Sequence, residues 1–264
     1  KLKIVAQLDA LGIGYIEAGN PGSNPKDLEF FKRVSELELK HAKIIAFGST
    51  RRIGVKAADD NNLRSLLSAN TQAVAIFGKS WNYQVTDILR TTLQENLAMI
   101  GDTIAYLKAQ DKEVVFYAEH FFDGYKANAD YAFATLQAAA DAGADVLVLC
   151  DTNGGTFPNE VFEITQKVVA FFPKVQVGIH CHNDCEMAVA NSVAAVQAGA
   201  TQVQGTINGI GERCGNANLC SIIPNLQFKL GHNCIPPENI STLTHVARFV
   251  SEVANMPFND KAPY

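Results

Sequence analysis

The sequence predicts an α/β protein built as a (β/α)8 barrel, and three observations support this fold class. First, seven short β-rich runs recur along the chain, each preceded by a segment with helical character. Second, several runs are almost wholly apolar, as expected for strands of a parallel sheet covered on both faces. Third, a helix–glycine–strand unit repeats three times. Seven such units in about 210 residues match the spacing of a barrel better than that of an open doubly wound sheet.

The predicted strands are runs of β-branched and aromatic residues bounded by polar residues or glycine. They cover residues 13–19, 43–48, 73–78, 113–120, 145–152, 175–183 and 201–209. A barrel of this kind has eight strands, whereas the chain opens on a helix-like segment. We therefore expect the first strand of the barrel to lie upstream of Lys1.

Three glycines punctuate the repeated unit. Gly12, Gly143 and Gly199 each follow a predicted helix and precede a predicted strand, where glycine can adopt the left-handed cap conformation. No low-complexity linker interrupts the series. We expect residues 1–240 to form one barrel, and residues 241–264 to form its edge or the start of a linker subdomain.

Several classes of protein are disfavoured. The run Gly12-Ile13-Gly14 lacks the third glycine of a dinucleotide fingerprint and precedes its strand, which argues against a Rossmann fold. The formal charge is −5 and no basic run exceeds Arg51-Arg52, which argues against binding of nucleic acid or membrane surfaces.

Six scattered cysteines indicate reduced thiols and a cytoplasmic location. The chain begins with Lys1 and not Met, so a removed targeting signal stays open.

Polar residues gather where a barrel enzyme places its chemistry, at the C-terminal ends of the strands. Glu17, Glu119, His180 and His182 lie inside otherwise apolar strands. A general preference of loops for polar residues does not account for these four positions.

His180 and His182 are two residues apart in one strand, so their side chains should point to the same face. A lone buried histidine is usually a hydrogen-bonded core residue, but two at this spacing at a strand end indicate a metal site. Cys181 should face the other way, and Cys185 should lie in the following helix. We interpret both as ordinary thiols, since no second cysteine pair with zinc-site spacing exists.

The residues after this strand suggest a helix start. Asn183 and Glu186 have the spacing of a capping box. Asp184 is interpreted as a cap or as a partner of a metal ligand, and not as a ligand itself.

Two histidines do not complete a metal site. The glycine-rich loop at residues 209–216 follows the next strand and can bring Asn216 close. Its amide oxygen suits Mg²⁺ or Mn²⁺. An acidic ligand is expected from the strand upstream of Lys1.

Two further side chains are candidates for catalysis and substrate binding, and a third lies on the same face. Glu119, a carboxylate in an apolar strand, is the candidate for proton transfer or for orienting a bound water; a barrel ion pair is the alternative. Tyr117 lies two residues earlier and so shares its face. Thr152 ends its strand and can donate to a substrate carboxylate, with a helix cap as the alternative.

The motifs "IEAGNP", "AEHFFDGYKAN", "LCDTNGG", "GIHCHNDCEMAVANSVAAVQAGA" and "INGIGERCGNANL" together resemble the acyl-CoA-dependent isopropylmalate/homocitrate/citramalate synthase family. This family belongs to the metal-dependent barrel superfamily that includes the hydroxymethylglutaryl-CoA lyases. The resemblance covers essentially the whole chain. Within the family, "FGKSWNYQVTDILRTTLQENLAMI" and "AEHFFDGYKAN" are most similar to the citramalate-synthase type.

The resemblance implies roles for individual residues. His180, His182 and Asn216 match the family's metal-binding positions. Glu119 matches its active-site glutamate, and Thr152 matches the threonine that contacts the oxoacid carboxylate. Tyr117 matches a position that lines the pocket for acyl-CoA and oxoacid.

The implied reaction is a Claisen-type condensation of acetyl-CoA with a 2-oxoacid, most closely pyruvate, on Mg²⁺, Mn²⁺ or Zn²⁺. Isopropylmalate or homocitrate synthesis, carbon–carbon lyase or aldolase chemistry on the same site, and a metal-free barrel that serves as an assembly partner are the alternatives. A homodimer is also implied. The family's Arg-Asp-Gly motif would lie upstream of Lys1. The family's linker histidine, implicated in catalysis, and its C-terminal regulatory domain are expected to lie outside these 264 residues.

Overall fold

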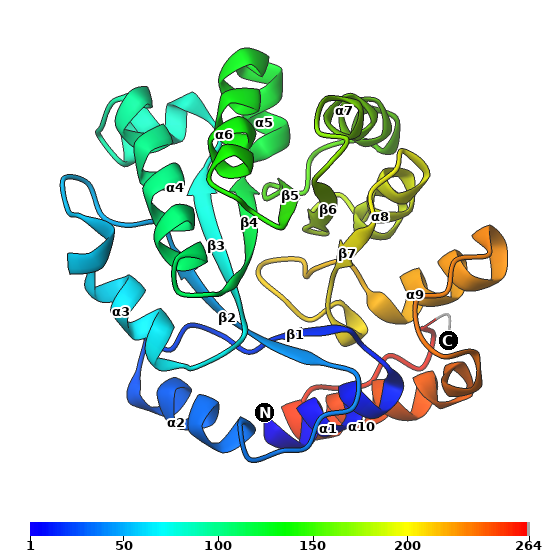
Figure 1. Cartoon of the computed structure of the whole chain (residues 1–264). Helices are drawn as coiled ribbons and strands as arrows, with labels where there is room; N and C mark the ends of the chain where they lie inside the picture. Colours follow the sequence, from blue (N-terminus) through cyan, green and yellow to red (C-terminus); the bar gives the residue numbers. More distant parts are fainter. Residues whose placement is uncertain (263–264) are drawn as a thin grey trace.

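Seven parallel strands form one curled sheet, in which each strand pairs with the next strand along the chain (Figure 1). The computed structural model describes residues 1–262. The strands are β1 (Tyr15–Glu17), β2 (Lys43–Ser49), β3 (Ala73–Lys79), β4 (Glu113–Glu119), β5 (Val146–Asp151), β6 (Gln176–Cys181) and β7 (Gln202–Gln204). β1 and β7 are the edges of the sheet and do not pair with each other. The curvature is that of a barrel, and this confirms the predicted fold class.

All seven predicted strands are present, but two are much shorter than expected. β1 and β7 each have three residues. After Gln204 the chain leaves the sheet and makes a 3-10 turn at Ile207–Gly209, where Asn208 takes a left-handed φ of 63°. Within residues 1–262, no eighth strand joins the edges. The strand expected upstream of Lys1 therefore stays a prediction.

The helices pack around the outside of the sheet (Figure 1). They are α1 (Leu2–Leu11), α2 (Pro25–Val34), α3 (Asn61–Ser68), α4 (Leu93–Lys108), α5 (Phe121–Ala127), α6 (Ala129–Asp141), α7 (Pro158–Phe171), α8 (Ala188–Gln197), α9 (Leu219–Pro224) and α10 (Leu243–Ala254). α10 lies beside α1, and the two helices share an apolar cluster that includes Leu11, Leu243 and Val246. Every helix within residues 1–262 is too short or too polar to span a bilayer.

The three predicted glycine caps are confirmed. Gly12, Gly143 and Gly199 adopt left-handed φ values of 97°, 93° and 108° at the ends of α1, α6 and α8. Glycine adopts this conformation without the steric strain that a side chain would bring, so each helix turns directly into a strand.

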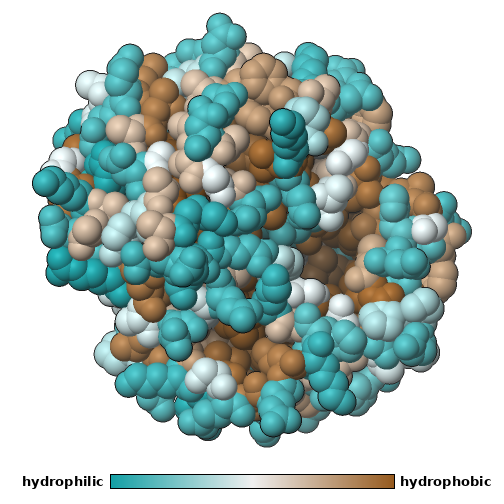
Figure 2. Space-filling view, viewed as in Figure 1, coloured by the Kyte–Doolittle hydropathy of each residue, from teal (hydrophilic) through white to brown (hydrophobic). Residues whose placement is uncertain are grey.

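Side chains along each strand alternate between two apolar layers. In β4, Phe116 and Ala118 belong to the large core between sheet and helices. Val115 and Tyr117 belong to a smaller cluster on the inner face. Glu119 continues the inner series, since it is two residues beyond Tyr117. The space-filling view shows a hollow in which apolar side chains reach the surface, with polar side chains around it (Figure 2).

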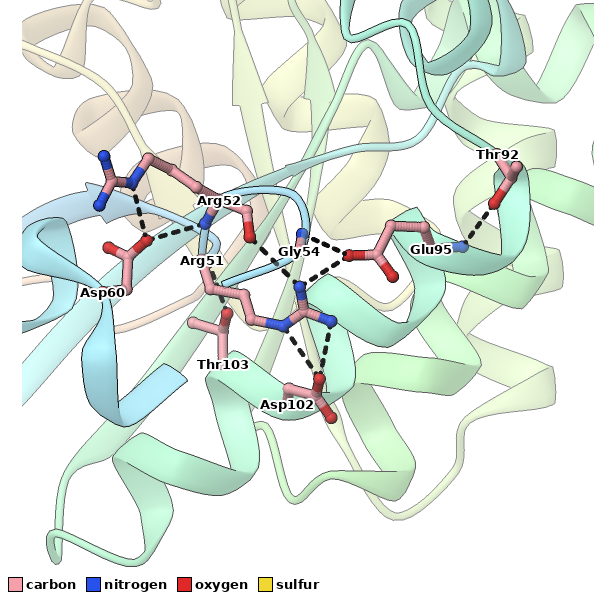
Figure 3. Close-up of polar contacts among 8 residues, drawn as sticks. All are labelled: Arg51, Arg52, Gly54, Asp60, Thr92, Glu95, Asp102 and Thr103. Carbon is pink, nitrogen blue, oxygen red and sulfur yellow. Dashed lines mark hydrogen bonds and ion pairs between the residues drawn. The ribbon is translucent and has the colours of Figure 1, made fainter. Parts of the chain in front are cut away.

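The loop after β2 is fixed by a buried arginine. Arg51 is only 5% exposed. Its guanidinium pairs with Glu95 at 2.8 Å and with Asp102 at 2.8 Å, both on α4 (Figure 3). Its backbone N–H donates to Thr103 Oγ1 at 2.8 Å. Arg52 donates from its backbone and its side chain to the fully buried Asp60, which caps α3. Two helices therefore hold the rim of the sheet at this strand end.

We expect Arg51→Met to lower the free energy of unfolding by about 1–3 kcal/mol, because Glu95, Asp102 and a backbone carbonyl lose a donor. Arg64→Met is the matched control. Arg64 pairs with Asp59 at 3.5 Å, and both side chains are more than half exposed, so the expected loss is within about 0.5 kcal/mol. Urea unfolding of both variants measures the difference. Equal losses would show that the buried network does not hold the loop.

Candidate functional site

The two histidines at the end of β6 converge on one point. The Nε2 atoms of His180 and His182 are 3.1 Å apart. Two ligands bound at about 2.1 Å to one ion, at right angles to each other, are separated by about 3 Å. The spacing of the rings therefore fits a shared metal ion.

The surroundings keep both rings neutral. Burial, together with the neighbouring His182, lowers the pKa of His180 to about 4. Burial and then the Arg213 guanidinium lower the pKa of His182. A neutral imidazole has one nitrogen without a proton, and a metal ion binds at a nitrogen of this kind. The pair is therefore in the correct charge state for binding at neutral pH.

Asn216 lies beside the pair. Its backbone forms an antiparallel bridge with His182, and the adjacent Gly215 carbonyl accepts the Asn183 N–H at 2.8 Å. The Asn216 Oδ1 atom is buried and has no hydrogen-bond partner among the described residues. An unpartnered buried oxygen calls for a partner, and a cation would satisfy this one.

The donor set is incomplete within residues 1–262. No group of three or more histidine, cysteine or acidic side chains gathers there in a way that could hold a metal ion. The two imidazoles and the unpartnered Asn216 amide oxygen are the candidate donors in this part of the chain.

The residues after His182 differ from two expectations. Cys185 lies in an exposed turn and not in a helix, because α8 begins only at Ala188. The expected capping box does not form, since Glu186 takes a left-handed φ of 57°. Asn183 Oδ1 instead accepts the Ala188 N–H at 3.2 Å. Cys181 is 1% exposed and packs in the outer core, as expected for a side chain opposite to the histidines.

Asp184 does not cap the helix. It forms a two-point pair with Arg213, with Nε–Oδ1 at 2.7 Å and Nη2–Oδ2 at 2.8 Å. Arg213 Nη2 also lies 2.8 Å from His182 Nδ1. These bonds from Arg213 lower the pKa of the Asp184 carboxyl. Asp184 is thus linked to His182 through the hydrogen bonds of Arg213.

Glu119 forms an ion pair with Lys79 across the β3–β4 register. The ion pair that was the alternative interpretation of Glu119 is therefore present in the structure. The carboxylate is still partly accessible, with 24% of its side chain exposed.

Tyr117 lies next to the histidines. Its ring centroid is 6.2 Å from that of His180, and its hydroxyl donates to Glu17 Oε2 at 2.7 Å. Burial and then Glu17 hold the pKa of Tyr117 well above its usual range, so the phenol stays protonated. Phe47 and Phe77 stack at 5.3 Å and continue this aromatic wall.

Thr152 follows β5 and does not cap α7, which begins at Pro158. Its Oγ1 accepts the His120 N–H at 2.9 Å, and its carbonyl accepts from Arg213 at 2.7 Å. No residue among 1–262 accepts the proton of this hydroxyl, which can therefore donate to a ligand.

Cavities lie at both ends of the described part of the sheet. One of about 330 Å³ lies at the C-terminal ends of β2 and β3, between Arg51, Phe77, Lys79 and Met99. This volume is within the range of small-molecule pockets. A larger cavity of about 750 Å³ lies at the opposite, N-terminal ends of the strands, around Glu113. The smaller cavity is at the same end of the sheet as the histidines and Glu119, but none of these three side chains lines it.

Four side chains matter here that were not assigned a role from sequence. They are Glu17, Lys79, Gln204 and Arg213. Alternation offered a signal for Gln204, because Gln202 and Gln204 repeat the i, i+2 spacing on the strand beside the histidines. Lys79 and Glu119 both end strands, but their pairing depends on a register that the sequence does not contain.

Known proteins resemble this chain in sequence and in fold. The chain is 58% identical over 264 residues to an (R)-citramalate synthase of Aquifex aeolicus (strain VF5), covering all of this chain and 50% of that protein. It is 34% identical to a 2-isopropylmalate synthase of Vibrio parahaemolyticus, covering 97% of this chain and 49% of that protein. The chain thus spans about half the length of these relatives.

A solved hydroxymethylglutaryl-CoA lyase from Pseudomonas aeruginosa superimposes with a TM-score of 0.81 at 16% identity, covering 99% of this chain and 87% of that one. At this identity the match shows the fold alone. The family model described as HMGL-like matches residues 1–250. The chain therefore belongs to the HMGL-like family.

Proposed function

We propose that the protein condenses acetyl-CoA with pyruvate to give citramalate and CoA. The observation that carries this proposal is the 58% identity over the whole chain to an (R)-citramalate synthase, against 34% to a 2-isopropylmalate synthase. The convergent histidines at the C-terminal ends of the strands support it, because barrel enzymes place their chemistry there.

The proposed reaction forms one carbon–carbon bond and breaks one thioester. A base removes a proton from the methyl group of acetyl-CoA, and the resulting enolate carbon attacks the keto carbon of pyruvate. The keto oxygen takes up a proton and becomes a hydroxyl group. Water then cleaves the thioester, releasing CoA as its thiol and leaving the second carboxylate of citramalate.

His180, His182 and Asn216 would hold a divalent metal ion, Mg²⁺ or Mn²⁺ and alternatively Zn²⁺. Such an ion supplies Lewis-acid polarisation of a carbonyl oxygen when it is bound. The incomplete donor set is consistent with a further acidic ligand, which stays a prediction. Thr152 is proposed to donate its free hydroxyl proton to the carboxylate of the oxoacid.

Glu119 is proposed as the group that accepts a proton or orients water. It is partly accessible and lies on the same face as Tyr117, which contacts His180. A carboxylate near the reacting methyl group is suited to general-base catalysis. The Lys79 ammonium holds this carboxylate at its strand end.

Tyr117, Phe47 and Phe77 are proposed to select a small oxoacid. Stacked aromatic rings leave little room beside them, so the methyl group of pyruvate fits more readily than a branched or charged side chain. One methylene discriminates only weakly, and 2-isopropylmalate or homocitrate synthesis is therefore the nearest alternative. Lyase or aldolase chemistry on the same site is the second, and the shared fold with hydroxymethylglutaryl-CoA lyases favours including it.

The domain organisation, the oligomeric state and the cellular location are proposed as well. Residues 1–240 would be the catalytic barrel. Residues 241–264 would be the barrel edge or the start of a linker, and 263 and 264 lie outside the described residues. The packing of α10 against α1 supports the first of these. A homodimer is inferred from the resemblance alone, and a cytoplasmic location from the six scattered cysteines.

We expect the intact protein to release CoA from acetyl-CoA with pyruvate much faster than with 2-oxoisovalerate or 2-oxoglutarate. Thiol capture in single-turnover experiments measures this release. Preference for 2-oxoisovalerate or 2-oxoglutarate would instead assign isopropylmalate or homocitrate synthesis. Release with none of the three, together with cleavage of a hydroxyacyl-CoA, would support the lyase alternative.

We expect Glu119→Gln to lower kcat by about 10²–10⁴-fold with little change in KM for pyruvate, because a general base acts on the chemical step. Glu113→Gln is the matched control, since Glu113 pairs with Lys43 at the opposite end of the same strand. Steady-state kinetics of both variants with Mn²⁺ provide the measurement. A kcat for Glu119→Gln within a few-fold of the control would exclude Glu119 from the chemistry.

A further inference from the structure

A continuous line of hydrogen bonds runs through the two histidines from the loop after β7 to β7 itself. Arg213 Nη2 lies 2.8 Å from His182 Nδ1. His182 Nε2 lies 3.1 Å from His180 Nε2, and His180 Nδ1 lies 3.2 Å from Gln204 Oε1. Gln204 Nε2 then donates to Gln202 Oε1 at 3.1 Å.

Only one arrangement of protons satisfies every link. A guanidinium can only donate, so His182 Nδ1 must be an acceptor without a proton. The neutral ring then carries its proton on Nε2 and donates to His180 Nε2. His180 in turn carries its proton on Nδ1 and donates to Gln204 Oε1. The two adjacent histidines are therefore opposite tautomers.

We propose that Gln204 and Arg213 are positioning residues with opposite effects on metal binding: Gln204 holds His180 in the tautomer that binds a metal, and Arg213 holds His182 in the tautomer that does not. This inference rests on the metal site of the proposed function.

Gln204 supports binding because it accepts the Nδ1 proton of His180. The Nε2 lone pair of that ring then faces the shared point. Partners of this kind fix the tautomer and orientation of ligating histidines, and their loss typically costs about 10–100-fold in metal affinity. The register places Gln204 directly opposite His180 on the neighbouring strand, so the contact is built into the sheet.

Arg213 opposes binding because it occupies the acceptor position of His182. For His182 to bind a metal through Nε2, its ring proton must move to Nδ1. The Nδ1–H and the Arg213 N–H would then both be donors, so Arg213 could not stay in its present position. Two acceptors for the Nδ1 proton lie nearby. Arg213 Nη2, which contacts His182 Nδ1, also donates to Asp184 Oδ2 at 2.8 Å and to the Thr152 carbonyl at 2.7 Å. The Arg213 side chain is 44% exposed, so it can withdraw without disturbing the core.

The tautomers are tested first, by long-range ¹H–¹⁵N NMR of the metal-free protein labelled at histidine. His180→Gln and His182→Gln assign the two rings. We expect His180 to carry its proton on Nδ1 and His182 to carry it on Nε2. Two rings in the same tautomer would overturn the inference, whatever the activity of the protein.

Metal affinity is tested second, by Mn²⁺ titration followed by electron paramagnetic resonance. We expect Gln204→Leu to weaken Mn²⁺ binding about tenfold or more, while Gln204→Glu keeps an acceptor and binds. Arg213→Leu is expected to bind Mn²⁺ more tightly than the wild type. Structural damage would weaken binding in both leucine variants, so opposite signs distinguish positioning from misfolding.

The outcomes separate this inference from the function on which it rests. Wild-type protein that binds no Mn²⁺ would overturn the proposed metal site and the inference together. Wild-type binding with unchanged affinity in Gln204→Leu, or weakened affinity in Arg213→Leu, would overturn the inference alone.

Discussion

The two-residue alternation of side chains along parallel strands is the constraint on which the site depends. It places His180 on the inner face, turns Cys181 toward the helices, and brings the two imidazoles to 3.1 Å. The same alternation on β4 puts Tyr117 and Glu119 on one face. Because all seven strands are parallel, these inner side chains meet at one end of the sheet. Convergence of the polar groups thus follows from strand direction and period.

The parts of the fold that depend on local pattern could be predicted from sequence. The seven strands, the parallel sheet and the three glycine caps each follow from apolar runs or from a backbone conformation that glycine adopts easily. Strand ends were harder, because hydrogen bonding to a neighbour decides them. β7 stops at Gln204, where the chain turns away, although the prediction extended this strand to Gly209.

Contacts between distant residues could not be predicted in the same way. The ion pair of Lys79 with Glu119 depends on strand register, and the contact of Arg213 with His182 depends on the path of a loop. The turn that keeps Cys185 out of α8 depends on Glu186, a residue type that rarely takes a positive φ. These contacts, more than the strand pattern, decide how the site histidines are held and which protons they carry.

The central claim is that His180 and His182 together bind one metal ion. Pulsed electron paramagnetic resonance of the Mn²⁺-loaded protein tests it directly, because the nitrogen couplings report how many imidazoles are coordinated. We predict couplings from two imidazoles in the wild type and from one in His182→Ala. Couplings from no imidazole in the wild type, or a spectrum unchanged by His182→Ala, would contradict the claim.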